Sequence, residues 1–176
     1  IENCDNTGNV TGNRWVGGVC GYNDGTSDNC YTTGTVTGTM DVGDVCGQND
    51  GGTFQNCYYL AESETDELDG TTAKTAEQFE SGEVAYLLNG SKSDDTSVFR
   101  QNLDNGQTAD ALPVLDSTHG VVYNGTTCTG IVYYTNDKRK TAESHAWDEN
   151  GFCKNDPAHY QPAIYSYSNV AYEISN

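Results

Sequence analysis

Long apolar runs are missing from this sequence, and apolar residues make up only 35% of it. No stretch reaches the roughly 18 apolar residues that a membrane-spanning helix needs, so membrane insertion is not expected. Basic residues are also scarce: 8 Lys and Arg stand against 26 Asp and Glu, which gives a formal net charge of -18. That charge repels a phosphate backbone and an anionic membrane surface, so nucleic acid is not an expected partner.

Recognisable catalytic patterns are missing as well. The chain has three His, and neither a Ser-His-Asp arrangement nor a phosphate-binding loop can be identified. The neighbouring carboxylates Asp94 and Asp95, and Asp104 with Asp110, lie in polar segments and are expected to be solvated rather than paired for glycoside hydrolysis. His119 has no Cys or Ser nucleophile beside it. We therefore expect a protein that is not an enzyme.

The sequence does contain an internal repeat. Placing Cys4 over Cys30, an offset of 26 residues, also aligns several Gly and Val and the Asn-Asp-Gly triplets that begin at Asn23 and Asn49. A third unit starts at Asn56. Each unit alternates β-forming residues with Thr and Gly and has no helical apolar stripe, so it fits one coil of a β-solenoid.

Stacked coils would bring equivalent residues to the spacing of paired strands, about 4.8 Å. Two columns of cysteines result, Cys4 with Cys30 and Cys57, and Cys20 with Cys46. They serve either as small buried hydrophobic residues or as disulfides between neighbouring coils. A column of asparagines is expected to form an amide ladder, namely Asn3, Asn29 and Asn56.

The Asn-Asp-Gly triplets predict tight turns, because these residue types tolerate positive φ. Stacking would place Asp24 and Asp50 one coil apart, and carboxylate oxygens suit Ca²⁺. Turn formation alone also explains these residues, so a calcium site is the less favoured interpretation.

The pattern V-x-G…V-G-x-V-C-G-x-N-D-G…N-C-Y over residues 1 to about 60 resembles the GLUG motif of bacterial surface proteins, which also occurs in some secreted immunoglobulin A peptidases. The resemblance implies an extracellular or cell-surface protein and does not imply catalysis. It points to a structural or adhesive module, with other modules of the same long chain and host or glycan ligands as partners. The alternatives are a carbohydrate-binding module or an accessory region of a secreted hydrolase or peptidase. Any export signal is expected upstream, because the chain starts inside a repeat.

The middle of the chain predicts one helix. Thr75 and Gln78 can form a capping box, and the apolar residues that follow give a helix over about 76–89 with one broad apolar face and a weak point at Gly82. We expect this helix to cover an open end or side of the solenoid. Short β-like runs follow it at residues 98–100, 112–115 and 120–123.

The C-terminal quarter contains four soft metal ligands, Cys128, His145, Cys153 and His159. Two Cys and two His suit a tetrahedral structural zinc site, and the segment has too few apolar residues for a core of its own. A disulfide between Cys128 and Cys153 is the alternative for an exported chain. A third possibility is that all four side chains are unpaired.

These features predict an all-β-dominated chain: a short β-solenoid of stacked coils of about 26 residues, one capping helix and a small irregular C-terminal ribbon. The expected parts are the coils at 1–60, the helix with short strands at 61–125, the Cys/His ribbon at 126–163 and the first strand of a following module at 164–176.

Overall fold

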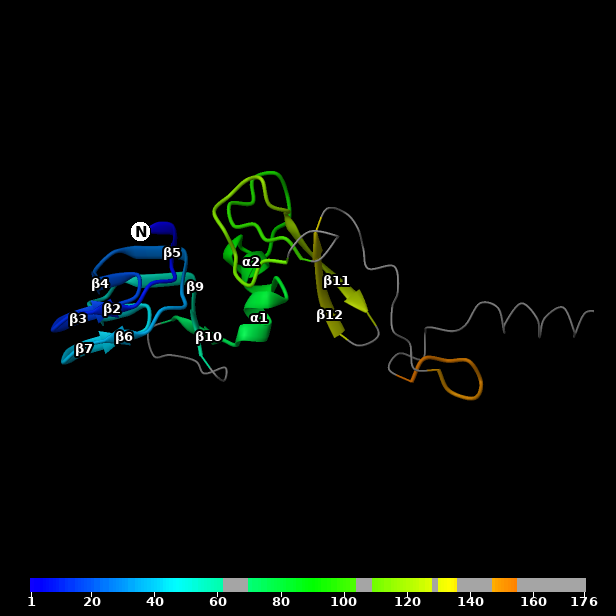
Figure 1. The fold of residues 1–176 in the computed structure, drawn as a ribbon, viewed down its shortest axis with the longest axis horizontal. Coiled ribbons are helices and arrows are strands. Elements are labelled where there is room, and N and C mark those ends of the chain that lie inside the picture. Colours follow the sequence, from blue (N-terminus) through cyan, green and yellow to red (C-terminus); the bar gives the residue numbers. More distant parts are fainter. Residues whose placement is uncertain (62–69, 104–108, 128–129, 136–146, 155–176) are drawn as a thin grey trace, which may run out of the picture. The chain divides into compact units, whose positions relative to one another are not determined.

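The computed structural model describes residues 1–61, 70–103, 109–127, 130–135 and 147–154 (Figure 1). These residues are rich in β-strand and include two short helices. The chain divides into two compact units, residues 1–124 with 133–137, and residues 125–132 with 138–176. The first unit holds the whole repeat and both helices. Within the described residues, neither helix is long and apolar enough to span a membrane.

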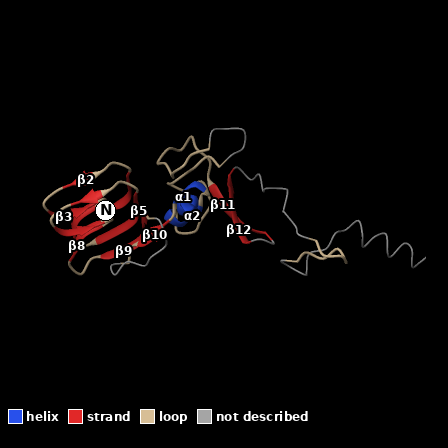
Figure 2. Ribbon diagram, turned by 60° about the horizontal axis from the view of Figure 1, so that its bottom comes forward, coloured by secondary structure: helices blue, strands red, loops and turns tan. Residues whose placement is uncertain are grey.

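Each strand of the first repeat pairs in parallel with its counterpart in the second repeat (Figure 2). The first repeat consists of β1 (Glu2–Asn6), β2 (Val10–Thr11), β3 (Arg14–Gly17) and β4 (Cys20–Asn23). The second consists of β5 (Thr26–Thr32), β6 (Val36–Thr37), β7 (Met40–Gly43) and β8 (Cys46–Asn49). Then β9 (Thr53–Leu60) pairs with β5, and β10 (Thr72–Lys74) pairs with β9, so one sheet has the order β1-β5-β9-β10.

The pairing register is the one that the repeat offset predicts. Cys4 lies opposite Cys30, and Cys20 lies opposite Cys46. The offset grows by one residue after the second Asn-Asp-Gly turn, because Asn23 pairs with Asn49 whereas Thr26 pairs with Thr53. The second turn contains two consecutive glycines, Gly51 and Gly52, which accommodate the additional residue. Gly51 has a φ of 79°, a conformation that glycine adopts without strain.

Left-handed backbone recurs at equivalent positions of the repeats. Three of the residues with positive φ are the column of asparagines, Asn3 at 52°, Asn29 at 54° and Asn56 at 50°. A second such column consists of Trp15 at 56° and Asp41 at 53°. Each of the five lies inside a strand, where a left-handed residue bends the chain. Asn and Asp tolerate this conformation better than other residues with a Cβ, so the backbone explains the asparagines as much as the amide ladder does.

The interior of the stacked strands is narrow. Cys30, Cys57 and Val45 are buried in one cluster with Tyr59 and Ala73. Glycine is required where two segments of backbone meet: a Cβ on Gly47 would lie 2.4 Å from the carbonyl carbon of Trp15. Small side chains and bare backbone therefore fill the space that a larger core would need.

The helical region departs from the predicted single helix over 76–89, and that prediction is wrong. The structure has α1 (Ala76–Glu80) and α2 (Glu83–Leu88), which are separated at Gly82 with a φ of 90°. A Cβ at Gly82 would lie 2.4 Å from Cδ1 of Leu103, so the break makes room for that side chain. The predicted capping box between Thr75 and Gln78 is present, whereas Ala76, expected on the apolar face, is exposed.

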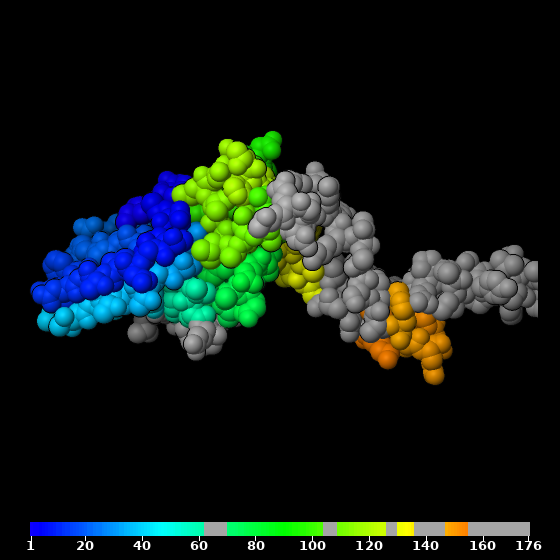
Figure 3. All heavy atoms as spheres, in the orientation of Figure 1, coloured from blue at the N-terminus to red at the C-terminus, as the bar shows by residue number. Residues whose placement is uncertain are grey.

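The two helices pack against a side of the stacked strands. A second core cluster joins the aromatic column of β5 and β9 to the helices, and consists of Tyr31, Tyr58, Phe79, Val84, Leu88 and Phe99. Tyr31 also donates a hydrogen bond from its buried hydroxyl to the carbonyl of Pro113, at 2.6 Å. In Figure 3 the green residues of this region lie directly against the blue and cyan repeat. The strands β5 and β9 and the two helices thus share this core cluster.

The prediction of short strands at 98–100 and 112–115 is also wrong. These segments form no strands and are joined by an isolated antiparallel bridge between Arg100 and Val114. The run expected at 120–123 enters β11 (Val122–Thr127), which pairs with β12 (Gly130–Thr135). In the second unit, the described residues contain an antiparallel bridge between Trp147 and Cys153. The expected strand at 164–176 lies outside the described residues.

Candidate functional site

The two cysteine columns lie inside the stacked strands as free thiols. The five side chains are Cys4, Cys20, Cys30, Cys46 and Cys57. Their sulfurs donate to nearby backbone carbonyls, for example Cys30 Sγ to Asp28 O at 3.2 Å and Cys46 Sγ to Gln48 O at 3.2 Å. Two interpretations of these columns were open, and the structure has small free thiols rather than disulfides between the paired strands.

The environment of these thiols opposes nucleophilic chemistry. Burial, together with the neighbouring Cys46, raises the pKa of the Cys20 thiol to about 12. The contact with the Cys57 side chain and burial raise the pKa of the Cys30 thiol, whereas the same contact lowers the pKa of Cys57. A thiol must ionise to attack or to bind a metal, so Cys20 and Cys30 are inert near neutral pH, and burial shields Cys46 and Cys57 from reagents.

The column of asparagines forms a hydrogen-bonded ladder. Asn29 Nδ2 lies 3.3 Å from Asn3 Oδ1, and Asn56 Nδ2 lies 2.9 Å from Asn29 Oδ1. Turning the Asn29 amide over would place its nitrogen 2.9 Å from the carbonyl of Leu88, at the end of α2. The ladder would then run in the opposite direction if the Asn3 and Asn56 amides turned over as well, because a donor must face an acceptor. In either orientation the amides link successive repeats.

A polar cleft of about 280 Å³ lies beside this ladder. Its floor includes a second column, in which Glu2 pairs with Asp28 and Asp28 pairs with Gln55. Its wall includes Lys92 and Val98 from the segment after α2. The cleft has charged and amide groups but no aromatic ring among its lining residues, so it offers hydrogen bonds without a surface for stacking.

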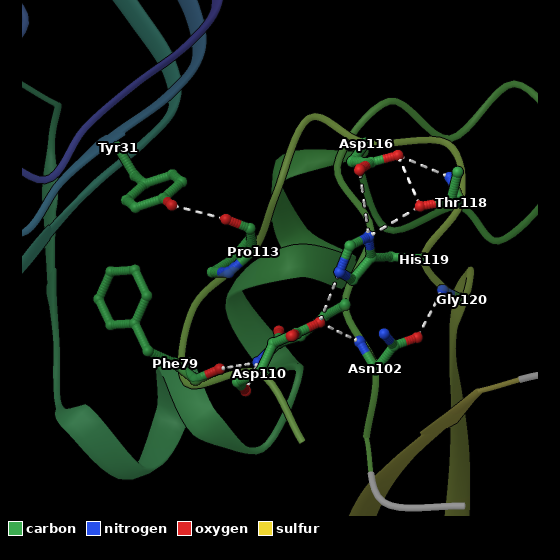
Figure 4. Close-up of polar contacts among 10 residues, drawn as sticks. Tyr31, Phe79, Asn102, Asp110, Pro113, Asp116, Thr118, His119 and Gly120 are labelled. Atoms are coloured by element: carbon green, nitrogen blue, oxygen red, sulfur yellow. Dashed lines mark hydrogen bonds and ion pairs between the residues drawn. The ribbon is translucent and has the colours of Figure 1, made fainter. Parts of the chain in front are cut away.

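His119 lies between two carboxylates (Figure 4). Its Nε2 is 3.5 Å from Asp110 Oδ2, and its Nδ1 is 3.7 Å from Asp116 Oδ2. Thr118 Oγ1 is 3.4 Å from Nδ1, but the hydroxyl already donates to Asp116 Oδ1 at 2.8 Å. The same carboxylates accept backbone amides, including that of Asn102 at 2.7 Å. The network therefore holds the 109–120 segment in place. It does not place a nucleophilic side chain next to a free base.

The predicted zinc ligands fall mainly on residues that the structure does not describe. Cys128, His145 and His159 lie outside the described residues. Cys153 is described, is buried and forms the bridge with Trp147. Within the described residues no group of three or more His, Cys, Asp or Glu is arranged to hold a metal ion. Zinc and the Cys128–Cys153 disulfide both stay predictions.

The proposed calcium residues have different surroundings. Asp24 is exposed, whereas Asp50 Oδ2 accepts a hydrogen bond from the hydroxyl of Tyr22 at 2.5 Å. A calcium ion at the stacked turns would compete with this hydroxyl for the Asp50 carboxylate.

An exposed aromatic pair was not singled out by the sequence. The rings of Trp15 and Tyr22 lie with their centroids 5.6 Å apart and their planes at 50°. The Arg14 guanidinium carbon lies 4.6 Å from the centre of the Trp15 ring, and its Nε forms an ion pair with Asp41 at 3.1 Å. The repeat alignment contained a signal for this pair, because Trp15 aligns with Asp41. Stacking of the repeats does not require a tryptophan at a position where the next repeat has an aspartate.

No protein-family model matches the chain, and neither a curated protein nor a solved structure is significantly similar to it.

Proposed function

We propose that this chain is a non-catalytic structural or adhesive module of an extracellular bacterial surface protein, and that its repeats are coils of a short β-solenoid. The observation that carries the proposal is the parallel, in-register pairing of all four strands of one repeat with those of the next. Such coils stabilise one another through nearest-neighbour contacts and extend a chain by simple repetition.

The chemistry of the repeats supports a structural role. Their interior consists of buried thiols, apolar side chains and closely approaching backbone, which leaves no room for a substrate. The resemblance to the GLUG motif supports an extracellular location, and a net charge of -18 suits a solvated surface domain. Partners of this module would be neighbouring modules and ligands at the cell surface.

The solenoid is tested by NMR on the labelled chain. Methyl contacts between Val10 and Val36, and between Val16 and Val42, are expected because these pairs lie directly opposite each other. A chain that shows neither contact while remaining folded would not be a stack of coils.

The location is tested on intact cells that produce the full-length protein. Antibodies against residues 1–124 should label unpermeabilised cells, and brief protease treatment should remove the label while a cytoplasmic protein stays intact. Labelling that requires permeabilised cells would contradict a surface location. Hydrolysis of a polysaccharide or peptide by the purified chain would contradict the non-catalytic role.

A further inference from the structure

Trp15 occupies a backbone position that does not favour it. Its φ of 56° is left-handed, a conformation that bulky residues rarely adopt, and the equivalent residue of the next repeat is Asp41, which tolerates it. The indole is also 43% exposed, so burial in a core does not compensate for the strain. Strained residues cluster at binding sites.

Tyr22 extends the aromatic surface of Trp15 and is held in a fixed orientation. It is 42% exposed, and its hydroxyl donates to the Asp50 carboxylate of the next repeat. This hydrogen bond also raises the pKa of Tyr22, so the hydroxyl stays protonated as the donor. The Tyr22 ring is therefore anchored to the second repeat, and the Trp15 ring lies against it at an angle of 50°.

Polar groups surround the two rings. Arg14 supplies guanidinium donors, and Asp41 and Asp50 supply carboxylate acceptors. Arg14 packs over the Trp15 ring while its own side chain is 57% exposed, which shows that this ring face accepts a positively polarised partner next to solvent. The C–H face of a sugar ring is polarised in the same sense, and its hydroxyls match the surrounding donors and acceptors.

We propose that Trp15 and Tyr22 form a binding site for a neutral sugar ring, with Arg14, Asp41 and Asp50 as hydrogen-bonding partners of its hydroxyls. A neutral glycan is favoured over a sulfated or sialylated one because the two carboxylates and the net charge of -18 repel anions. A protein partner would need a larger apolar area around the pair than this polar rim provides. The site goes beyond the structural role, because stacking of the repeats requires no ligand.

The second repeat supplies the variants for the test. The residue equivalent to Trp15 in the second repeat is Asp41, which has the same left-handed backbone, and the residue that pairs with Tyr22 is Gln48. Trp15→Asp and Tyr22→Gln thus introduce residues that the same backbone already accommodates one coil away. Trp147→Phe, which changes the other tryptophan of the chain, is the matched control.

The purified chain is applied to an array of neutral glucan, mannan, xylan, galactan and N-acetylglucosamine oligosaccharides, with sulfated and sialylated glycans beside them. At least one neutral glycan should be retained, with a loss of tenfold or more for Trp15→Asp, a smaller loss for Tyr22→Gln and no change for Trp147→Phe. Circular dichroism reports whether each variant is folded. The proposal is overturned if no neutral glycan binds, if only anionic glycans bind, or if Trp15→Asp binds like the parent chain.

A second measurement keeps the proposal testable if Trp15→Asp fails to fold. The indole N–H signal of Trp15 in the parent chain, assigned by its persistence in Trp147→Phe, should shift when the retained oligosaccharide is added. A shift confined to the Trp147 signal, or a Trp15 signal that moves only with a peptide or protein ligand, would also overturn it.

Discussion

At the scale of single residues, the asparagine column contributes both a left-handed backbone conformation and an amide ladder, and one series of variants can separate the two contributions. Asn29 adopts a left-handed φ of 54° and its amide contacts Asn3 and Asn56. A left-handed conformation costs an ordinary residue about 1–2 kcal/mol, and each amide hydrogen bond contributes about 1 kcal/mol. Backbone and ladder should therefore both contribute to stability.

We expect Asn29→Ala to lower the free energy of unfolding by about 3 kcal/mol, because it loses both contributions. Asn29→Gly loses the amide but tolerates positive φ, so it should cost about 1 kcal/mol less than Asn29→Ala. Urea unfolding followed by circular dichroism measures the difference. If glycine proves no better than alanine, the left-handed backbone is not what selects asparagine.

Gly47 tests the close approach of backbone inside the repeats. Its added Cβ would lie 2.4 Å from the backbone nitrogen of Val16, which cannot move without separating the coils. Gly47→Ala should therefore destabilise the chain by about 3 kcal/mol or more, as expected for overpacking against a rigid neighbour. Gly25→Ala is the control, because a Cβ there meets nothing within 4 Å, and its thermal midpoint should be nearly unchanged. Equal effects of the two variants would contradict the packing described here.

At the scale of elements, buried tyrosines couple β5 and β9 to the helices and make the coupling sensitive to alkali. Burial raises the pKa of Tyr58 from its ordinary value of 10.0 to about 12, and burial also raises the pKa of Tyr31. Above pH 10 the unfolded chain releases these protons first, so the folded state binds more protons and stability falls as pH rises. This contribution is fully present below pH 10.

Between pH 10 and 12 the free energy of unfolding should thus decrease, and Tyr58→Phe should make the decrease shallower because one titrating group is removed. Denaturant unfolding at several pH values measures both slopes. For comparison, Tyr22→Phe removes a hydroxyl whose pKa is raised by its hydrogen bond to Asp50, but this residue is exposed, so the variant should change the slope less. Identical slopes for the parent chain and Tyr58→Phe would rule out this role of Tyr58.

The thiol columns give a second prediction at this scale. Burial should keep Cys20, Cys30, Cys46 and Cys57 unreactive towards iodoacetamide in the folded chain near pH 7.5, and the raised pKa of Cys20 and Cys30 adds to this protection. Cys4 is partly exposed and should react first. Peptide mapping by mass spectrometry, with and without denaturant, identifies the sites. Rapid labelling of Cys30 without denaturant would show that the coils open.

Parts of this fold were predictable because each repeat places equivalent residues in the same surroundings. The offset of 26 residues predicted the register of the cysteines, since parallel in-register strands place equivalent residues side by side. The break at Gly82 was seen only as a weak point, because the side chain that uses it, Leu103, is distant in sequence. The bond between Tyr31 and Pro113 spans 82 residues and no local pattern encodes it. The exposed Trp15 was missed because its strain depends on a dihedral angle, which composition does not reveal.

At the scale of the whole molecule, the two units differ in what can stabilise them. The first has two apolar clusters, and one of them joins the repeat to the helices. In the second, Cys153 is the buried apolar side chain among the described residues, and it lies opposite Trp147 in an antiparallel bridge. Small segments with little apolar content usually depend on a metal ion or a disulfide.

We therefore expect the second unit to lose its structure when one of two agents is added. A chelator should have this effect if Cys128, His145, Cys153 and His159 bind zinc, and a reductant if Cys128 and Cys153 form a disulfide. The fluorescence of Trp147 reports the change once Trp15→Asp has removed the other indole, and the first unit serves as an internal control through its circular dichroism. Metal analysis then separates the cases: one zinc per chain supports the metal site, whereas no zinc, with Cys128 and Cys153 alkylated only after reduction, supports the disulfide. A Trp147 signal that responds to neither agent would mean that this unit is stabilised without either cross-link.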